Sequence, residues 1–146
     1  MSVSAGHYHQ GRLGHAFWRR VVAAGILPQD TDVATADDAL VAAGHGITDL
    51  IKAVTARETA TTGELRAGVG PLWQKIALWR PAAVVFVYRR AAEAAAGRAL
   101  PEPWGRLDGV ALAGRPCFLL PGPDAPRWQV DEGVNFLRNL AAALPR

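Results

Sequence analysis

The chain has 146 residues, of which half are hydrophobic and a fifth are charged, and its formal net charge is +3. This composition excludes a disordered chain and predicts a single domain over residues 1–146 with a substantial core. The single cysteine, Cys117, excludes an internal disulfide and a multi-cysteine zinc site, and its apolar surroundings predict a buried thiol. Because the sequence shows neither a signal peptide nor an apolar window of membrane-spanning length, we expect a cytoplasmic protein without a membrane partner.

Helical periodicity dominates the first third of the chain. The spacing of apolar residues predicts a helix over residues 14–24, with Phe17 and Trp18 anchoring it in the core. A second helix is predicted to follow Thr35, which is a good N-cap residue, and a short third one is expected over residues 47–55.

Residues 71–121 alternate helices with apolar strands. A helix is predicted from Pro71, a residue favoured at the first helical position, to the residues before Pro81. The continuous apolar run over residues 82–88 predicts a buried parallel strand, and a further helix is expected to end near Gly97.

The C-terminal part is predicted to hold a strand pair and a helix. Two short strands are expected on either side of a turn at residues 114–116, and a last helix is expected over residues 130–145. Asp131 and Glu132 would then occupy its first turn, where the helix dipole favours acidic side chains. The alternation of helices with apolar strands predicts the α/β class.

The stretch "GHYHQGRLGHAFW", residues 6–18, concentrates three of the four histidines beside glycines and aromatics. His7 and His9 can both face a metal ion only in an extended or loop segment, because side chains two residues apart diverge on a helix. No acids or thiols accompany them, so we expect no metal here. The glycines before the helix would also suit a phosphate, although no strand precedes them as in a dinucleotide-binding motif, and they serve turns equally well.

Four other features have two interpretations each. The pairs Arg19–Arg20 and Arg89–Arg90 either contact phosphates or lie on solvated helix faces. Asp49 is either a catalytic acid or a helix cap. The loop "LPGPDAPRW", residues 120–128, either faces a ligand at the carboxyl end of a parallel strand or simply connects a strand to a helix.

Taken in order, four segments resemble the mismatch-specific uracil/thymine-DNA glycosylase family of the uracil-DNA glycosylase superfamily. They are "GHYHQGRLGHAFW", "GHGITDLIKAVT", "IALWRPAAVVFVYRRAAEAA" and "WGRLDGVALAGRPCFLLPGPDAPR", and they cover nearly the whole chain from Gly6 onward. The resemblance implies a three-layer α/β/α domain with a small, mostly parallel central sheet. It also implies a monomeric enzyme that flips uracil or mismatched thymine out of double-stranded DNA and hydrolyses the N-glycosidic bond without a cofactor.

The resemblance also assigns a base pocket. His9 falls at the position of the aromatic that stacks on the flipped base, and the adjacent Tyr8 is an alternative for this role. His15 falls at the position of an asparagine near the base. His9, His15 and Asp124 are the candidate catalytic groups, because a histidine that titrates near neutrality can stabilise a departing pyrimidine anion.

A DNA-contacting loop is implied near the C-terminus. Ala125, Pro126 and Arg127 match the loop that wedges into the base stack, and Arg127 is expected to fill the gap or hold a phosphate. The family's first strand and its water-positioning loop precede the part of the family that this sequence matches. Four alternatives are therefore open. The start codon is assigned too late, or the protein is an inactive relative that binds DNA, or another group carries out the catalysis. The fourth alternative is an unrelated α/β protein that binds a small molecule.

Overall fold

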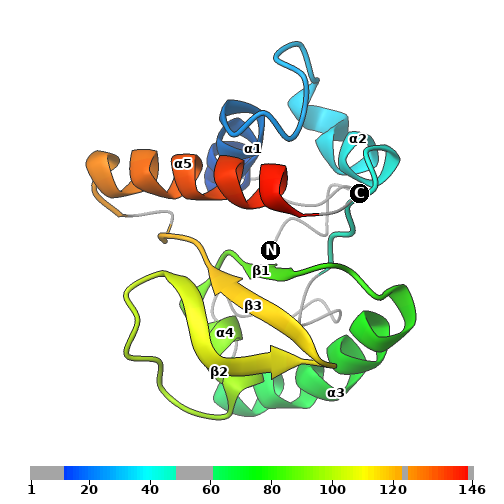
Figure 1. Ribbon diagram of the computed structural model, residues 1–146, viewed down its shortest axis with the longest axis vertical. Helices are drawn as coiled ribbons and strands as arrows, with labels where there is room; N and C mark the ends of the chain where they lie inside the picture. The colour runs from blue at the N-terminus through cyan, green and yellow to red at the C-terminus, as the bar shows by residue number, and fades with distance from the viewer. Residues whose placement is uncertain (1–11, 49–60, 123–124, 145–146) are drawn as a thin grey trace. The chain divides into compact units, whose positions relative to one another are not determined.

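The computed structural model describes residues 12–48, 61–122 and 125–144. These residues divide into two compact units, of which the first comprises residues 12–48 with 125–144 and the second comprises residues 61–122 (Figure 1). Most of the helix predicted over residues 47–55 falls outside the described residues. No described helix is long and apolar enough to cross a membrane.

The first unit is helical and is built around Trp18. Its elements are α1 (Arg12–Ala23), the 3-10 turn η2 (Val33–Thr35), α2 (Ala36–Ala42) and α5 (Arg127–Ala143). Trp18 is completely buried and packs with Val21, Leu27, Ala36 and Leu40. The helix predicted over residues 14–24 and the anchoring role of Trp18 are therefore confirmed.

The entry to α2 differs in detail from the prediction. Thr35 occupies the N-cap position, but its side chain makes no capping hydrogen bond. The Asp32 side chain instead accepts a hydrogen bond from the Ala34 N–H at 2.9 Å and caps η2. The predicted position of the helix start is confirmed, but the side-chain cap lies at the preceding 3-10 turn and not at α2.

The second unit contains a mixed sheet of three strands, in the order β1-β3-β2. The strands are β1 (Val84–Phe86), β2 (Gly105–Leu112) and β3 (Arg115–Leu119). β1 runs parallel to β3, which confirms the predicted parallel strand over a shorter range, and β2 pairs antiparallel with β3. The expected burial of β1 is wrong for most of its length, because only Phe86 is buried and Val85 is exposed. Helices combined with this small sheet confirm the α/β class.

The turn between β2 and β3 lies at Ala113–Gly114, slightly earlier than predicted. Both residues have positive φ angles, 48° and 79°, as a two-residue type I′ hairpin loop requires. Arg115 and Pro116 already belong to β3. Pro116 pairs with β2 but lies outside the residues that pair with β1, so its missing N–H interrupts no bond between β1 and β3.

Helix α3 (Thr62–Trp79) begins well before Pro71, so the predicted start is wrong. The Thr61 hydroxyl accepts a hydrogen bond from the Glu64 N–H at 3.1 Å, which provides a capped start. Pro71 lies inside the helix, where it removes one backbone donor, but the buried side chains on either side of it continue the apolar stripe. The helix ends as expected before Pro81, with Arg80 in a left-handed conformation.

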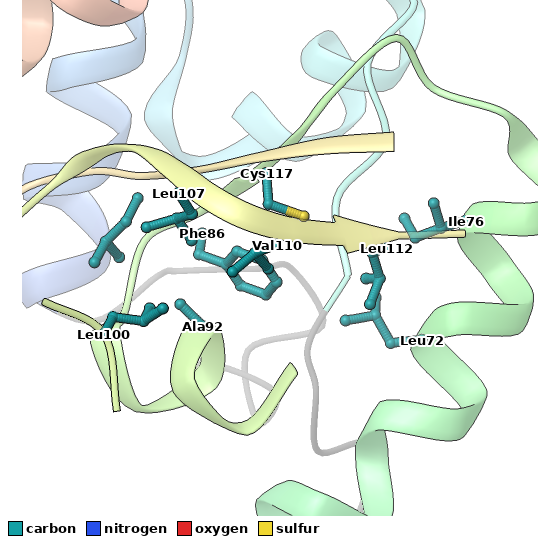
Figure 2. Close-up of a cluster of buried hydrophobic side chains, with 10 residues drawn as sticks. Leu72, Ile76, Phe86, Ala92, Leu100, Leu107, Val110, Leu112 and Cys117 are labelled. Atoms are coloured by element: carbon teal, nitrogen blue, oxygen red, sulfur yellow. The ribbon is translucent and has the colours of Figure 1, made fainter. Parts of the chain in front are cut away.

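The core of the second unit lies between the sheet and its two helices, α3 and α4 (Arg89–Ala96) (Figure 2). Its buried members come from all five elements and from the loop before β2: Leu72, Ile76, Phe86, Ala92, Leu100, Leu107, Val110, Leu112, Cys117 and Leu119. Gly97 ends α4 with a φ of 73°, as predicted. Cys117 is 1% exposed, which confirms the buried thiol, and burial raises its pKa.

Helix α5 begins at Arg127 and not at residue 130. Pro126 is its N-cap residue, and the Pro126 carbonyl accepts hydrogen bonds from the N–H groups of Gln129 and Val130. The proline therefore does not separate a loop from a later helix but starts the helix itself. As a result, Asp131 and Glu132 lie beyond the first turn, which contains no acid.

Candidate functional site

The structure describes only some of the residues implied by the sequence resemblance. Tyr8, His9 and Asp124 lie outside the described residues. His15 lies on α1, and the segment 125–127 leads into α5. Both helices belong to the first unit, so the described parts of the expected site share one compact body.

His15 lies on the side of α1 that borders the buried core. It is partly buried, three residues before the fully buried Trp18 and seven residues before the partly buried Val22. At helical spacing these three positions share one side of the helix. His15 therefore borders the cluster around Trp18, and part of the residue remains exposed.

The start of α5 presents a cation and an aromatic ring to solvent. Arg127 is exposed and Trp128 is 63% exposed, whereas Ala125 is partly buried. Neither Arg127 nor Trp128 makes a hydrogen bond or ion pair within the described part of the chain. We call Pro126, Arg127 and Trp128 the α5 start segment.

The backbone of the α5 start segment also favours a negative charge. The first helical hydrogen bonds run from Gln129 and Val130 to Pro126, so the Arg127 and Trp128 N–H groups precede the helical ladder. Such groups at a helix start attract anions, and the first turn carries no acid that would occupy them. Asp131 lies one turn further along the helix, which limits the anion-favouring region to the first turn.

A direct bond connects α1 with α5. The Arg138 guanidinium donates a hydrogen bond to the Ala23 carbonyl at 2.6 Å, and a second to the Asn135 side chain at 2.9 Å. Arg127 lies eleven positions before Arg138, or about 16 Å of helix, and His15 lies eight positions before Ala23, or about 12 Å. The bond thus joins the later parts of both helices and does not itself place His15 against Arg127.

Arg89 has a structural role that the sequence analysis did not consider. Its guanidinium donates to the carbonyl oxygens of Leu100 at 3.2 Å and of Glu102 and Pro103 at 2.6 Å each. Glu93, one turn along α4, lies 3.9 Å away. These partners occupy its donors, although the side chain remains 39% exposed. It holds the loop that connects α4 to β2.

The carboxyl ends of the two parallel strands meet at one edge of the sheet. Leu120, which follows β3, donates its N–H to the Phe86 carbonyl at the end of β1 at 2.9 Å. The prediction that this loop directly follows a parallel strand is therefore confirmed at Leu120, whereas Arg127 and Trp128, which were expected in the loop, belong to α5. Tyr88 is exposed at the same edge, and the sequence analysis missed it because it belongs to an otherwise continuous apolar run.

Metal ligands are not gathered in the described part of the chain, where no three His, Cys, Asp or Glu side chains form a group that could hold an ion. His7 and His9 lie outside it. The site is thus defined by one partly buried imidazole and by the exposed α5 start segment.

Comparison with known proteins adds no assignment to this geometry. No family model matches the sequence, and a search among curated proteins found no significant match.

Proposed function

We propose that this protein binds double-stranded DNA through the α5 start segment and removes uracil or mismatched thymine by flipping the base. The observation that supports DNA contact is the exposure of Arg127 and Trp128 side by side at a helix start without an acid. Base removal is inferred from the resemblance of four ordered segments to mismatch-specific glycosylases. We infer from the same resemblance a single three-layer α/β/α domain that acts as a monomer.

The proposed DNA contact combines charge with stacking. The Arg127 guanidinium and the first free N–H groups of α5 would bind one or two phosphates, a contact that positions the duplex without reading its sequence. Trp128 supplies a flat apolar surface that can enter the space left by the flipped base or stack against a neighbouring base. Pro126 holds the start of the segment rigid, which reduces the entropy lost on binding.

The proposed chemistry is hydrolysis of the N-glycosidic bond. A water molecule forms a bond to the sugar C1′, the bond from C1′ to the base nitrogen breaks, and the water loses a proton to a carboxylate or to solvent. The departing pyrimidine carries the bonding electron pair as an anion, which a nearby imidazolium would stabilise. His15 is the described residue that we propose for this stabilising role, with His9 as a further candidate. Asp124 is a candidate only for accepting the proton of the water, because a carboxylate repels an anion.

A glycosylase assay tests this proposal. Purified protein is incubated with duplexes containing one U·G or one T·G pair, and abasic sites are detected by alkaline cleavage. Arg127→Ala and Trp128→Ala are expected to reduce cleavage at subsaturating protein concentration. Arg106→Ala, which removes an exposed arginine from β2 in the other unit, serves as the matched control and is expected to cleave as the unaltered chain does.

Binding measurements separate DNA contact from catalysis. Loss of the Arg127–phosphate contact should lower the slope of log K against log salt by about 1 and weaken binding uniformly across sequences. Binding without base release would support a DNA-binding module instead of an enzyme. Binding that is absent or independent of salt would contradict both.

A further inference from the structure

One side of helix α3 carries a second aromatic and cationic surface, in the unit that does not contain the proposed site. Arg66, Trp73 and Arg80 follow one another at intervals of seven residues. Seven residues are about 20° short of two full helical turns, so Arg66 and Trp73 lie on nearly the same line along the helix. Arg80 follows the last helical residue as its C-cap. We call these three residues the α3 Arg–Trp stripe.

The stripe is accessible, and its cations are unpaired. Trp73 is 49% exposed, and both arginines are exposed. None of the three side chains makes a hydrogen bond or ion pair within the described part of the chain. The only acid of the helix, Glu64, is partly buried and lies about 160° around the helix from Arg66.

The surroundings of Trp73 leave the residue 49% exposed. The residues one turn before and one turn after it on the same side are Val69, Gly70 and Ala77. Gly70 and Ala77 are exposed and have no side chain long enough to lie over an indole ring, whereas Val69 is partly buried. The core-facing Leu72 and Ile76 point into the cluster shown in Figure 2 and hold the helix in place below the ring.

We propose that the α3 Arg–Trp stripe binds single-stranded nucleic acid, with a base stacked on Trp73 and phosphates held by Arg66 and Arg80. Stacking on an exposed aromatic ring between cations is how proteins hold unpaired strands without reading their sequence. The distance along the helix from Arg66 to Arg80 is about 21 Å, which is long enough to contact several consecutive nucleotides of a single strand. The inference does not depend on glycosylase activity or on the α5 start segment.

A protein partner or a second copy of the chain fits this surface less well. Leu78 and Trp79 are also exposed on α3, but they lie about 140° and 120° around the helix from Trp73, in opposite directions. The exposed apolar side chains of this helix therefore do not form one continuous patch, as an apolar protein interface requires. The unpaired charges beside Trp73 complement a polyanion.

Fluorescence anisotropy with a labelled twelve-nucleotide oligothymidine tests the proposal. We expect Trp73→Ala to weaken binding about tenfold, because stacking on one aromatic ring contributes a factor of this order. Trp73→Phe should recover most of the loss. The double variant Arg66→Gln/Arg80→Gln should lower the slope of log K against log salt by about 1.4, since each single-strand phosphate contact contributes about 0.7.

Two controls make the result decisive. Leu78→Ala removes a more exposed apolar side chain from another side of the same helix and should bind as the unaltered chain does. Arg127→Ala and Trp128→Ala should reduce binding to duplex DNA but not to the oligothymidine, so the two proposed surfaces can fail independently. Unchanged oligothymidine binding in Trp73→Ala would overturn the proposal. The proposal would also be overturned if sedimentation showed that the only effect of Trp73→Ala is a loss of self-association.

Discussion

At the scale of single residues, Arg89 is the side chain with the most specific structural role. It donates hydrogen bonds to three carbonyl oxygens of residues 100–103. Replacing it with alanine leaves these acceptors without their charged donor, and we expect Arg89→Ala to lower the free energy of unfolding by about 2 kcal/mol. Urea unfolding followed by circular dichroism measures the change. Arg66→Ala, which removes an exposed arginine that makes no described bond, should change stability by less than about 0.5 kcal/mol, and equal effects would contradict the role of Arg89.

A second residue-scale prediction concerns the thiol of Cys117. Burial raises its pKa in the folded chain, so the folded state holds its proton where an unfolded thiol, with a pKa of about 8.5, has already lost it. The thiol's contribution to stability is therefore complete below about pH 8.5 and is lost as pH rises toward the folded pKa. Cys117→Ala should show a shallower loss of stability between pH 8 and 10. Identical pH profiles for the two proteins would contradict this.

The same residue shows how a pattern in the sequence predicts an environment. A lone cysteine in an apolar run is typical of a buried thiol, and Cys117 is buried. Arg89 shows the opposite case. Two adjacent arginines at the start of a helix give no indication of which one bends back, because the acceptors are carbonyls of a loop eleven to fourteen residues away. Only the folded path of that loop brings them together.

At the scale of elements, the start of α3 shows why helix boundaries were only partly predictable. The sequence predicts Pro71 as the first helical residue, but in the structure Pro71 lies inside the helix. The helix tolerates this proline because Leu65, Leu72 and Ile76 bury one continuous side. The stop at Arg80 and Pro81 was predictable, because proline disfavours a helical conformation in the residue before it. Thr61 is a residue type favoured at the N-cap, and it marks the observed start of the helix.

The capping bond at Thr61 leads to a prediction about α3. Thr61→Ala removes the hydroxyl that accepts the Glu64 N–H and should lower the free energy of unfolding by about 1 kcal/mol. The matched control is Thr62→Ala, because Thr62 is also exposed and is the first helical residue, whereas the capping bond is made by Thr61. Thermal and urea unfolding measure both variants. A cost at Thr62 equal to that at Thr61 would rule out a specific cap.

The hairpin turn between β2 and β3 permits a stabilising change. Ala113 has a φ of 48°, a left-handed conformation that is strained for alanine and tolerated by asparagine. We expect Ala113→Asn to raise the free energy of unfolding by about 0.5–1 kcal/mol, because Asn-Gly is the preferred pair for this turn. Ala111→Asn, placed in the extended part of β2, should lower stability instead. A loss of stability in both variants would contradict the turn argument.

At the scale of the whole molecule, the class of fold was predictable but the arrangement of strands was not. Apolar runs separated by helices indicate the α/β class, and two short strands around a turn indicate the antiparallel pair of β2 and β3. Which of these two strands pairs with β1 depends on the edge of the hairpin that β1 meets, and this choice leaves no local signal. For the candidate site, the resemblance predicts the role of Arg127. It does not predict the exposure of Trp128, which lies in the first turn of α5 because this helix begins at Arg127.

Every described helix and strand of the second unit contributes buried side chains to its core. We therefore expect a core substitution in one element to destabilise the other elements as well. Leu107→Ala should lower the free energy of unfolding by about 3 kcal/mol, because the side chain is buried in a cluster that cannot collapse fully around the vacancy. Amide hydrogen exchange should accelerate in β1 and β3 as well as in β2. The partly exposed Val85 provides the control variant, Val85→Ala, with a smaller expected effect. Acceleration confined to β2 would show that the cluster is not cooperative.

The hydrogen bonds from Arg89 to the connection between α4 and β2 also affect which substitutions this protein can accept during evolution. Each of its three acceptors is a main-chain oxygen, and every residue type carries one. Pro101 and Pro103 restrict the backbone path that presents those oxygens. The bonds to Arg89 therefore place no demand of their own on the side chains of the acceptor residues. Constraint on those side chains should come from elsewhere, from the core at Leu100 and from the backbone path at Pro103, while the hydrogen bonds themselves require only position 89 and the backbone conformation.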